Sequence, residues 1–77
     1  MNTEKLDLFV KIVEIGNLTR AAEVMGYTQS GATHIINSLE KELGVRLLER
    51  GRSGSKLTDE GARLFELAKE VVHWESS

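Results

Sequence analysis

The sequence predicts a mainly helical domain with one short two-stranded β-ribbon and a long final helix. Three observations lead to this prediction. Apolar residues recur at helical spacing in three successive segments, and a glycine closes each segment, at Gly16, Gly26 and Gly44. A stretch rich in Gly and Ser, between two short apolar runs, is typical of a tight turn that joins two strands. Proline is absent, so each helix can run without interruption.

The composition is that of a small globular domain. The 77 residues are 40% hydrophobic and 29% charged, and no run is apolar enough to cross a bilayer or to act as a signal peptide. Cysteine is absent, which excludes disulfides and thiolate chemistry. We therefore expect a cytoplasmic protein with no membrane partner.

The net charge of −2 argues against a surface that binds any polyanion, but the charges are unevenly spread. Arg46–Lys56 holds four basic residues and one acid, whereas Asp59–Glu75 holds five acids and two basic residues. Gly16–Ser38 holds one charge of each sign. The chain thus has a basic segment, an acidic segment and a nearly neutral middle.

Two helices are predicted before Gly26. The first runs from a cap at Thr3 to about Ile15, and its apolar residues cover more than one side: Leu6, Leu8, Phe9, Ile12, Val13 and Ile15. The second covers Leu18–Met25 behind the capping residue Asn17, with three residues facing inward: Ala21, Ala22 and Met25.

A third helix is predicted over Gln29–Leu43 behind a cap at Thr28. It has a single apolar stripe, made of Ala32, Ile35, Ile36, Leu39 and Leu43. The runs "VRLLER" (residues 45–50) and "KLT" (56–58) indicate two short strands around the turn. Thr58 caps a fourth helix that could continue to the end of the chain.

The second and third helices carry a helix-turn-helix signal. A helix that reads DNA enters the major groove end-first, and a second helix must brace it at a steep angle. Ala21 and Ala22 allow a close approach, Gly26 allows the turn, and Ala32 lies in the facing stripe. The alternative is an ordinary three-helix core, in which Ala pairs and helix-ending glycines are common.

The exposed face of the third helix is polar but uncharged. Helical periodicity places Gln29, Ser30, Thr33 and His34 on one side, opposite the apolar stripe. Short neutral donors and acceptors suit base edges, whereas long charged side chains are drawn to phosphates. We therefore predict that these four residues read bases. Asn37 lies on the same side. Two interpretations of Asn37 stay equally open: it contacts a base, or it is polar by chance and has no role in binding.

Basic residues are predicted to contact the DNA backbone and the minor groove. Arg50 and Arg52 flank a glycine at the tip of the turn, and Lys56 lies on the return strand, as in a wing that lies along a duplex. Arg20, near the start of the second helix, is a phosphate anchor. The alternatives are a soluble loop at the turn and a surface ion pair between Arg20 and Glu23.

The fourth helix has two apolar stripes. One consists of Leu64, Leu67, Val71 and Trp74, and the other of Gly61, Phe65, Ala68 and Val72. A helix at the edge of a domain needs one stripe for its own core, so the first stripe predicts a partner helix and a homodimer. The alternative is that Trp74 and Val72 fold back over the first helix.

Enzyme function has little support. Neither His34 nor His73 has another metal ligand three or four residues further on, and no nucleophile–base pair is suggested. We therefore predict no catalytic residue, no metal and no cofactor.

Several separate motifs resemble one known family. They are "GNLTRAA" from Gly16, "TQS" from Thr28, "SLEKELG" from Ser38, "RLLER" from Arg46 and "LTDEG" from Leu57. With Phe9 they resemble the N-terminal DNA-binding domain of LysR-type bacterial transcriptional regulators over nearly the whole chain. The resemblance implies a winged helix-turn-helix over residues 1–57, with a three-helix core. It also implies a linker helix over residues 58–77 that pairs two subunits antiparallel.

The resemblance also implies roles for single residues. The four predicted base readers would face bases, and the wing around Arg50 and Arg52 would meet the minor groove. Thr19 and Arg20 would approach phosphate, and we group Thr28 with them as a backbone contact. The partner implied is a double-stranded DNA operator, bound in the bacterial cytoplasm in association with the nucleoid.

The sequence departs from the family pattern in three ways. Ser30 stands where the family usually has proline, and His34 stands where a basic residue is common. The family's large effector-binding domain, through which a small-molecule inducer acts, is absent from the 77 residues. We expect either a piece of a longer regulator or a natural stand-alone domain.

Two other functions stay open at this point. The polar helix could contact a protein in a winged-helix interaction module, which the acidic net charge mildly favours. Alternatively, the chain could pair with full-length regulators through its last helix and have negligible DNA affinity.

Overall fold

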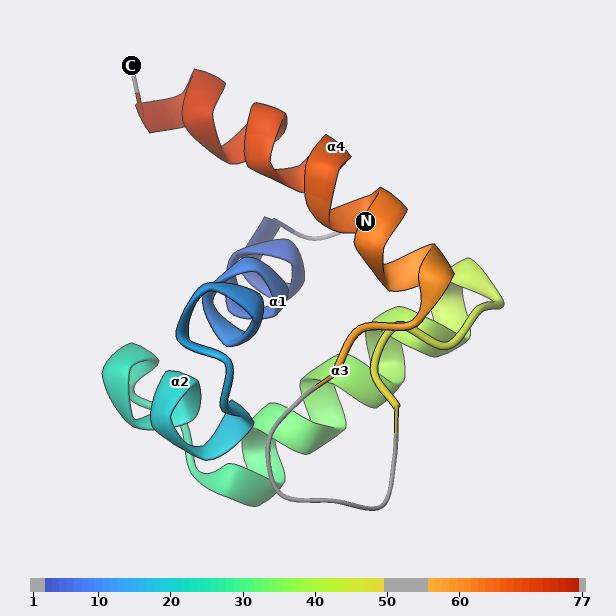
Figure 1. Cartoon of the computed structure of the whole chain (residues 1–77). Helices are drawn as coiled ribbons and strands as arrows, with labels where there is room; N and C mark the ends of the chain where they lie inside the picture. The colour runs from blue at the N-terminus through green and yellow to red at the C-terminus, as the bar shows by residue number, and fades with distance from the viewer. Residues whose placement is uncertain (1–2, 50–55, 77) are drawn as a thin grey trace.

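The structure is a computed structural model of the chain, and it describes residues 3–49 and 56–76, with side chains described up to Glu70. Figure 1 shows the order of the helices, which are α1 (Thr3–Ile15), α2 (Leu18–Met25), α3 (Gln29–Leu43) and α4 (Asp59–Ser76). The four predicted helices are therefore present, and α2 and α3 have the predicted bounds. Thr3 is the first residue of α1 rather than the cap before it.

Local capping explains where the middle helices begin and end. Asn17 accepts a hydrogen bond from the Arg20 backbone N–H at 3.0 Å, and Thr28 accepts one from the Gly31 N–H at 3.0 Å. At the end of α2, Gly26 takes the left-handed conformation with φ 81°, which L side chains rarely adopt. The Tyr27 N–H then donates to the Ala22 carbonyl at 2.8 Å and closes the helix.

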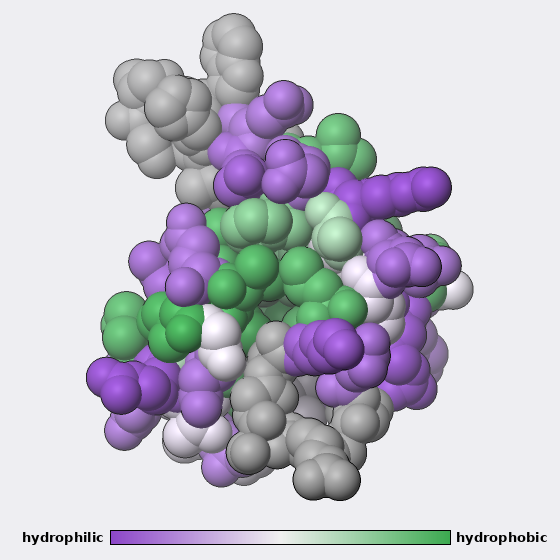
Figure 2. Space-filling model, in the orientation of Figure 1, coloured by the Kyte–Doolittle hydropathy of each residue, from purple (hydrophilic) through white to green (hydrophobic). Residues whose placement is uncertain are grey.

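The core is built around α1, which packs against each of the other three helices. Its buried residues lie on several sides, as predicted, and are Leu6, Leu8, Phe9, Val10 and Ile12. Ile15 was expected to join them but is exposed, because it occupies the last position of the helix. In Figure 2, hydrophobic side chains gather in the middle of the face shown, and hydrophilic side chains surround them.

The predicted β-ribbon is seen only at its base. Leu48 and Leu57 form an isolated antiparallel bridge, and the Glu49 N–H donates to the Lys56 carbonyl at 2.8 Å. The predicted strands over 45–50 and 56–58 are not formed as strands within the described residues. The tip of the turn, residues 50–55, lies outside the described residues.

The start of α4 is joined tightly to the segment that follows α3. The Thr58 N–H donates to the Leu47 carbonyl at 3.0 Å, and the Thr58 hydroxyl donates to the Arg46 carbonyl. Thr58 also caps α4 as predicted, because its hydroxyl accepts from the Gly61 N–H at 3.0 Å. A Cβ at Gly61 would lie 2.2 Å from the Leu47 carbonyl oxygen, so only glycine fits there.

None of the helices in the described part of the chain is long and apolar enough to span a membrane.

Candidate nucleic-acid interface

α2 and α3 pack against each other through small residues. Ala21 and Ala22 of α2 and Ala32 of α3 are at most 1% exposed, so the predicted small residues are buried in this packed pair of helices. Figure 1 shows α2 and α3 joined by a short turn, and the left-handed Gly26 lies in it. The predicted bracing of α3 by α2 is therefore present.

The outer face of α3 gathers the predicted base-reading residues into one shallow hollow. Gln29, Ser30 and His34 are exposed and Thr33 is half-buried; Asn37 is exposed and lines the hollow with them. The volume of the hollow is about 450 Å³. The Thr33 hydroxyl donates to the Gln29 carbonyl at 3.0 Å, which leaves its oxygen as an acceptor. This face offers amide, hydroxyl and imidazole groups to a ligand, without formal charge.

Gly31 has a structural role at the start of this face. A Cβ at Gly31 would lie 3.0 Å from the Thr28 Oγ1 atom, which is the capping oxygen of α3. The glycine therefore preserves the cap, at a cost of about 1 kcal/mol in helix propensity. Thr28 is exposed, so its hydroxyl can still donate to a ligand while it accepts the capping bond.

The basic residues fall into two groups. Lys5 pairs with Glu42, Lys11 with Glu14 and Lys69 with Glu66, which places the three paired cations on α1 and α4. The remaining basic residues within the described ranges make no ion pair there, and they are Arg20, Lys41, Arg46, Lys56 and Arg63.

Most of these unpaired cations belong to the helix-turn-helix and the segments around it. Arg20 does not form the alternative ion pair with Glu23, and Thr19 beside it is also exposed. Lys56 is exposed at the base of the ribbon. The predicted wing residues Arg50 and Arg52 lie outside the described residues.

The predicted dimerisation stripe of α4 is divided in the structure. Leu67 is 62% exposed, as a surplus stripe requires, but Leu64 is half-buried and packs against the core of its own domain. Ala68 belongs to the same core, and α4 packs against α1. The role of Leu64 in a dimer stays a prediction. The side chains of Val71 and Trp74 lie outside the described residues.

Sequence reasoning missed the part played by Glu40. Its carboxylate is buried and accepts hydrogen bonds from the backbone N–H groups of Leu47, at 2.7 Å, and Leu48, at 3.2 Å. It thereby holds the segment after α3 against that helix. The sequence offered one signal for this role, because Glu40 directly follows Leu39 and therefore lies at the edge of the apolar stripe of α3. No group of three potential metal ligands occurs among the residues that the structure describes.

These features define a helix-turn-helix protein: α2 packs against α3, a glycine turn joins them, and the outer face of α3 is polar. The family model described as "Bacterial regulatory helix-turn-helix protein, lysR family" matches residues 3–62. The chain therefore belongs to the lysR family of bacterial regulatory helix-turn-helix proteins.

Similar curated proteins are transcriptional regulators. The HTH-type transcriptional regulator CrgA of Neisseria meningitidis serogroup B (strain ATCC BAA-335 / MC58) is 41% identical over 71 residues, 92% of this chain and 24% of that protein. The nitrogen assimilation regulatory protein nac of Escherichia coli (strain K12) is 42% identical over 72 residues, 94% of this chain and 24% of that protein. The chain thus spans about a quarter of the length of these relatives.

Similar solved structures include DNA complexes. The BenM DNA-binding domain, crystallised with catB site 1 DNA, superposes with a TM-score of 0.93 at 34% identity, covering 99% of this chain and 82% of that one. The CbnR DNA-binding domain in complex with DNA has a TM-score of 0.91 at 33% identity, covering 99% of this chain and 87% of that one.

Proposed function

We propose that this domain binds double-stranded DNA with sequence preference and serves transcription regulation in bacteria. The observation that carries the proposal is the uncharged hydrogen-bonding face of α3, where five polar side chains line one hollow. Such a face suits base edges in the major groove. Its position on a helix-turn-helix of the lysR family, and the DNA complexes formed by similar domains, support the same function.

In this proposal each part of the domain has a separate role. α3 enters the major groove, and its readers are Gln29, Ser30, Thr33 and His34. The ribbon forms a wing that places its tip at the minor groove, through Arg50 and Arg52. Backbone phosphates are contacted by Thr19, Arg20, Thr28 and Lys56. Phosphate contacts fix the position of the domain, while base contacts select the sequence.

We further propose that residues 1–57 act as the DNA-binding unit and residues 58–77 as a linker that forms a homodimer. The exposed Leu67 supports this role, because a large apolar side chain in water is stabilised by a partner. Val71 and Trp74 would extend its contact surface. Two copies would then read two half-sites roughly 34 Å apart on one face of the duplex. The domain would act in the bacterial cytoplasm, and an inducer would act only through a domain outside these 77 residues.

The first experiment identifies the DNA site. The chain is mixed with a pool of random duplexes at low salt, and the retained DNA is sequenced. Two related half-sites are expected. Retention without any enriched sequence would contradict base reading, and no retention of any duplex would contradict DNA binding altogether.

Two substitutions then separate base reading from backbone binding. Gln29→Ala should weaken binding to the selected site by roughly tenfold or more and leave random duplexes little affected. Arg20→Ala, like Arg52→Ala, should weaken both duplexes by the same factor and lower the slope of log affinity against log salt by about 0.9. If Gln29→Ala and Arg20→Ala changed both duplexes alike, the division of roles would be wrong.

A further inference from the structure

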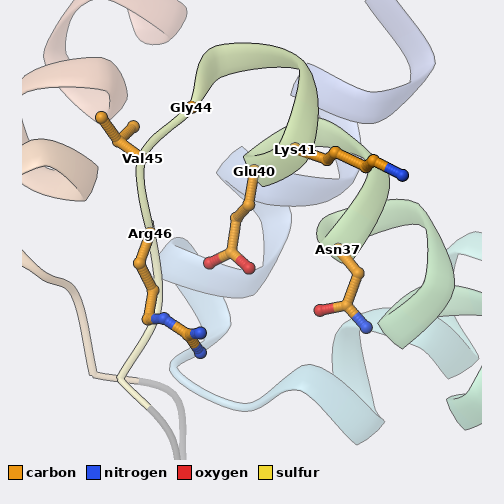
Figure 3. A pocket seen from close by; sticks show the side chains of 6 residues that line it. All are labelled: Asn37, Glu40, Lys41, Gly44, Val45 and Arg46. Carbon is orange, nitrogen blue, oxygen red and sulfur yellow. The ribbon is translucent and has the colours of Figure 1, made fainter.

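A second hollow lies beyond the predicted base-reading face, at the carboxyl end of α3. It has a volume of about 340 Å³ and lies between α3 and the segment that turns back at Gly44; Figure 3 shows the lining residues, which are Asn37, Glu40, Lys41, Gly44, Val45 and Arg46. In this view the side chains of Asn37, Glu40 and Arg46 extend toward one another from the two walls. The hollow is therefore lined with polar groups on both sides.

Asn37 belongs to both hollows and makes them one surface. Gln29, Thr33 and Asn37 follow one another at intervals of four residues and lie on one face of α3. At 1.5 Å per residue, Asn37 lies about 12 Å along the helix axis from Gln29, and Lys41 about 18 Å from it. The major groove is about 8.5 Å deep, and a reading helix enters it end-first. With Gln29 on a base edge, Asn37 therefore reaches the border of the groove, where the phosphates lie.

The charges in this second hollow favour an anion at its rim. Arg46 and Lys41 are exposed, and neither makes an ion pair within the described part of the chain. Glu40 is the one acid among the lining residues, and it is only 9% exposed. Its carboxylate accepts from two backbone N–H groups, whose dipoles offset part of its charge. The accessible charges are thus the two cations.

The geometry points to a seat for one backbone phosphate of the DNA strand that borders the groove read by α3. The Arg46 guanidinium and the Asn37 side-chain amide donate to the phosphate oxygens, and Lys41 adds positive charge beside them. This inference rests on the proposed function, and it assigns Asn37 to backbone binding rather than to base reading. Glu40 is a positioning residue in this arrangement, because it holds the backbone that carries Arg46.

The test compares three single variants on the selected duplex and on a random duplex over a range of salt concentrations. Arg46→Gln should weaken both by the same factor, about tenfold at low salt, and lower the salt slope by about 0.9. Asn37→Ala should weaken both alike by a smaller factor, without changing the sequence selected from random DNA. Lys69→Gln removes the same charge from α4 and should leave the salt slope unchanged.

Phosphate ethylation then locates the contact. One phosphate at the border of the half-site should interfere with binding of the parent chain when ethylated, and this interference should be lost in Arg46→Gln. An unchanged salt slope in Arg46→Gln would overturn the phosphate seat. A new base preference in Asn37→Ala would overturn it as well, since Asn37 would then be a base reader. The proposed function is tested separately, because it fails only if the parent chain itself selects no sequence.

Discussion

Replacing Gly61 with alanine should destabilise the domain, although the same change in most helices is stabilising. Gly61 lies in the first turn of α4 and is buried. Its missing Cβ would lie 2.2 Å from the Leu47 carbonyl oxygen and 3.0 Å from the carbonyl carbon. Both atoms belong to the backbone, so no side-chain rotation can relieve the overlap.

The expected change in the free energy of unfolding is the sum of three contributions. Alanine gains about 1 kcal/mol over glycine in helix propensity. The overlap forces a shift of roughly 1 Å, and overpacking of this kind typically costs about 1–3 kcal/mol, occasionally more. The Leu47 carbonyl also accepts from the Thr58 N–H at 3.0 Å, and distortion of that bond costs about 1 kcal/mol. The expected net loss is about 2 kcal/mol, from a total of roughly 4–12 kcal/mol for a chain of this length.

The assay is urea unfolding followed by far-UV circular dichroism, at one fixed protein concentration because dimerisation would add to the stability. Gly61→Ala should lower the midpoint by about 1–2 M urea. Ala62→Gly is the matched control, since Ala62 is exposed in the same turn and should lose only about 1 kcal/mol of helix propensity. If Gly61→Ala were as stable as the parent chain, the close approach of Leu47 to α4 would be refuted.

Three further substitutions test other contacts. Glu40→Ala leaves the buried N–H groups of Leu47 and Leu48 without their acceptor, and it should lower the free energy of unfolding in urea by about 2–4 kcal/mol. Glu40→Gln keeps an acceptor and should cost less. Equal losses in the two variants would contradict this role of Glu40. Thr28→Ala removes the cap of α3 and should cost about 1 kcal/mol in thermal unfolding, so an unchanged midpoint would count against the cap. The hydrogen bond from Lys5 lowers the pKa of Glu42 from its ordinary value of 4.5, against a smaller opposing effect of desolvation. The stabilisation by the Glu42 carboxylate is therefore full above pH 4.5 and is lost as the pH falls through the lowered pKa. Glu42→Gln should differ in stability from the parent chain at neutral pH only, and a difference that persists in strong acid would contradict the pairing.

The helices could be predicted from the sequence because their ends are fixed locally. Asn17 and Thr28 cap backbone N–H groups three residues further on, and Gly26 allows a left-handed turn. These signals need no knowledge of distant residues. The apolar spacing in α1 and α3 likewise predicted which sides are buried.

The polar face of α3 was predicted for the same reason. Helical periodicity alone places Gln29, Thr33 and Asn37 on one side, and the structure brings them into one hollow. Their proposed roles on DNA remain predictions.

Contacts between distant segments could not be predicted from local patterns. Glu40 reads as an ordinary surface acid, and only the return of the chain at Gly44 brings the N–H groups of Leu47 and Leu48 to it. The close approach of the Leu47 carbonyl to Gly61 also depends on the position of α4. The bridge between Leu48 and Leu57 likewise joins segments on opposite sides of the turn, and it is the part of the predicted ribbon that lies within the described residues.

The junction at Thr58 and Gly61 couples α4 mechanically to the segment that carries Arg46, beside the proposed DNA surface. Thr58 donates hydrogen bonds to the carbonyls of Arg46 and Leu47. Gly61 packs so closely against the Leu47 carbonyl that no Cβ would fit between them. Torque applied to the far end of α4 would therefore pass into the chain at Arg46 and the base of the ribbon. The Gln29 end of α3 is separated from this junction by the length of the helix, so the two ends of the proposed DNA surface would not move equally.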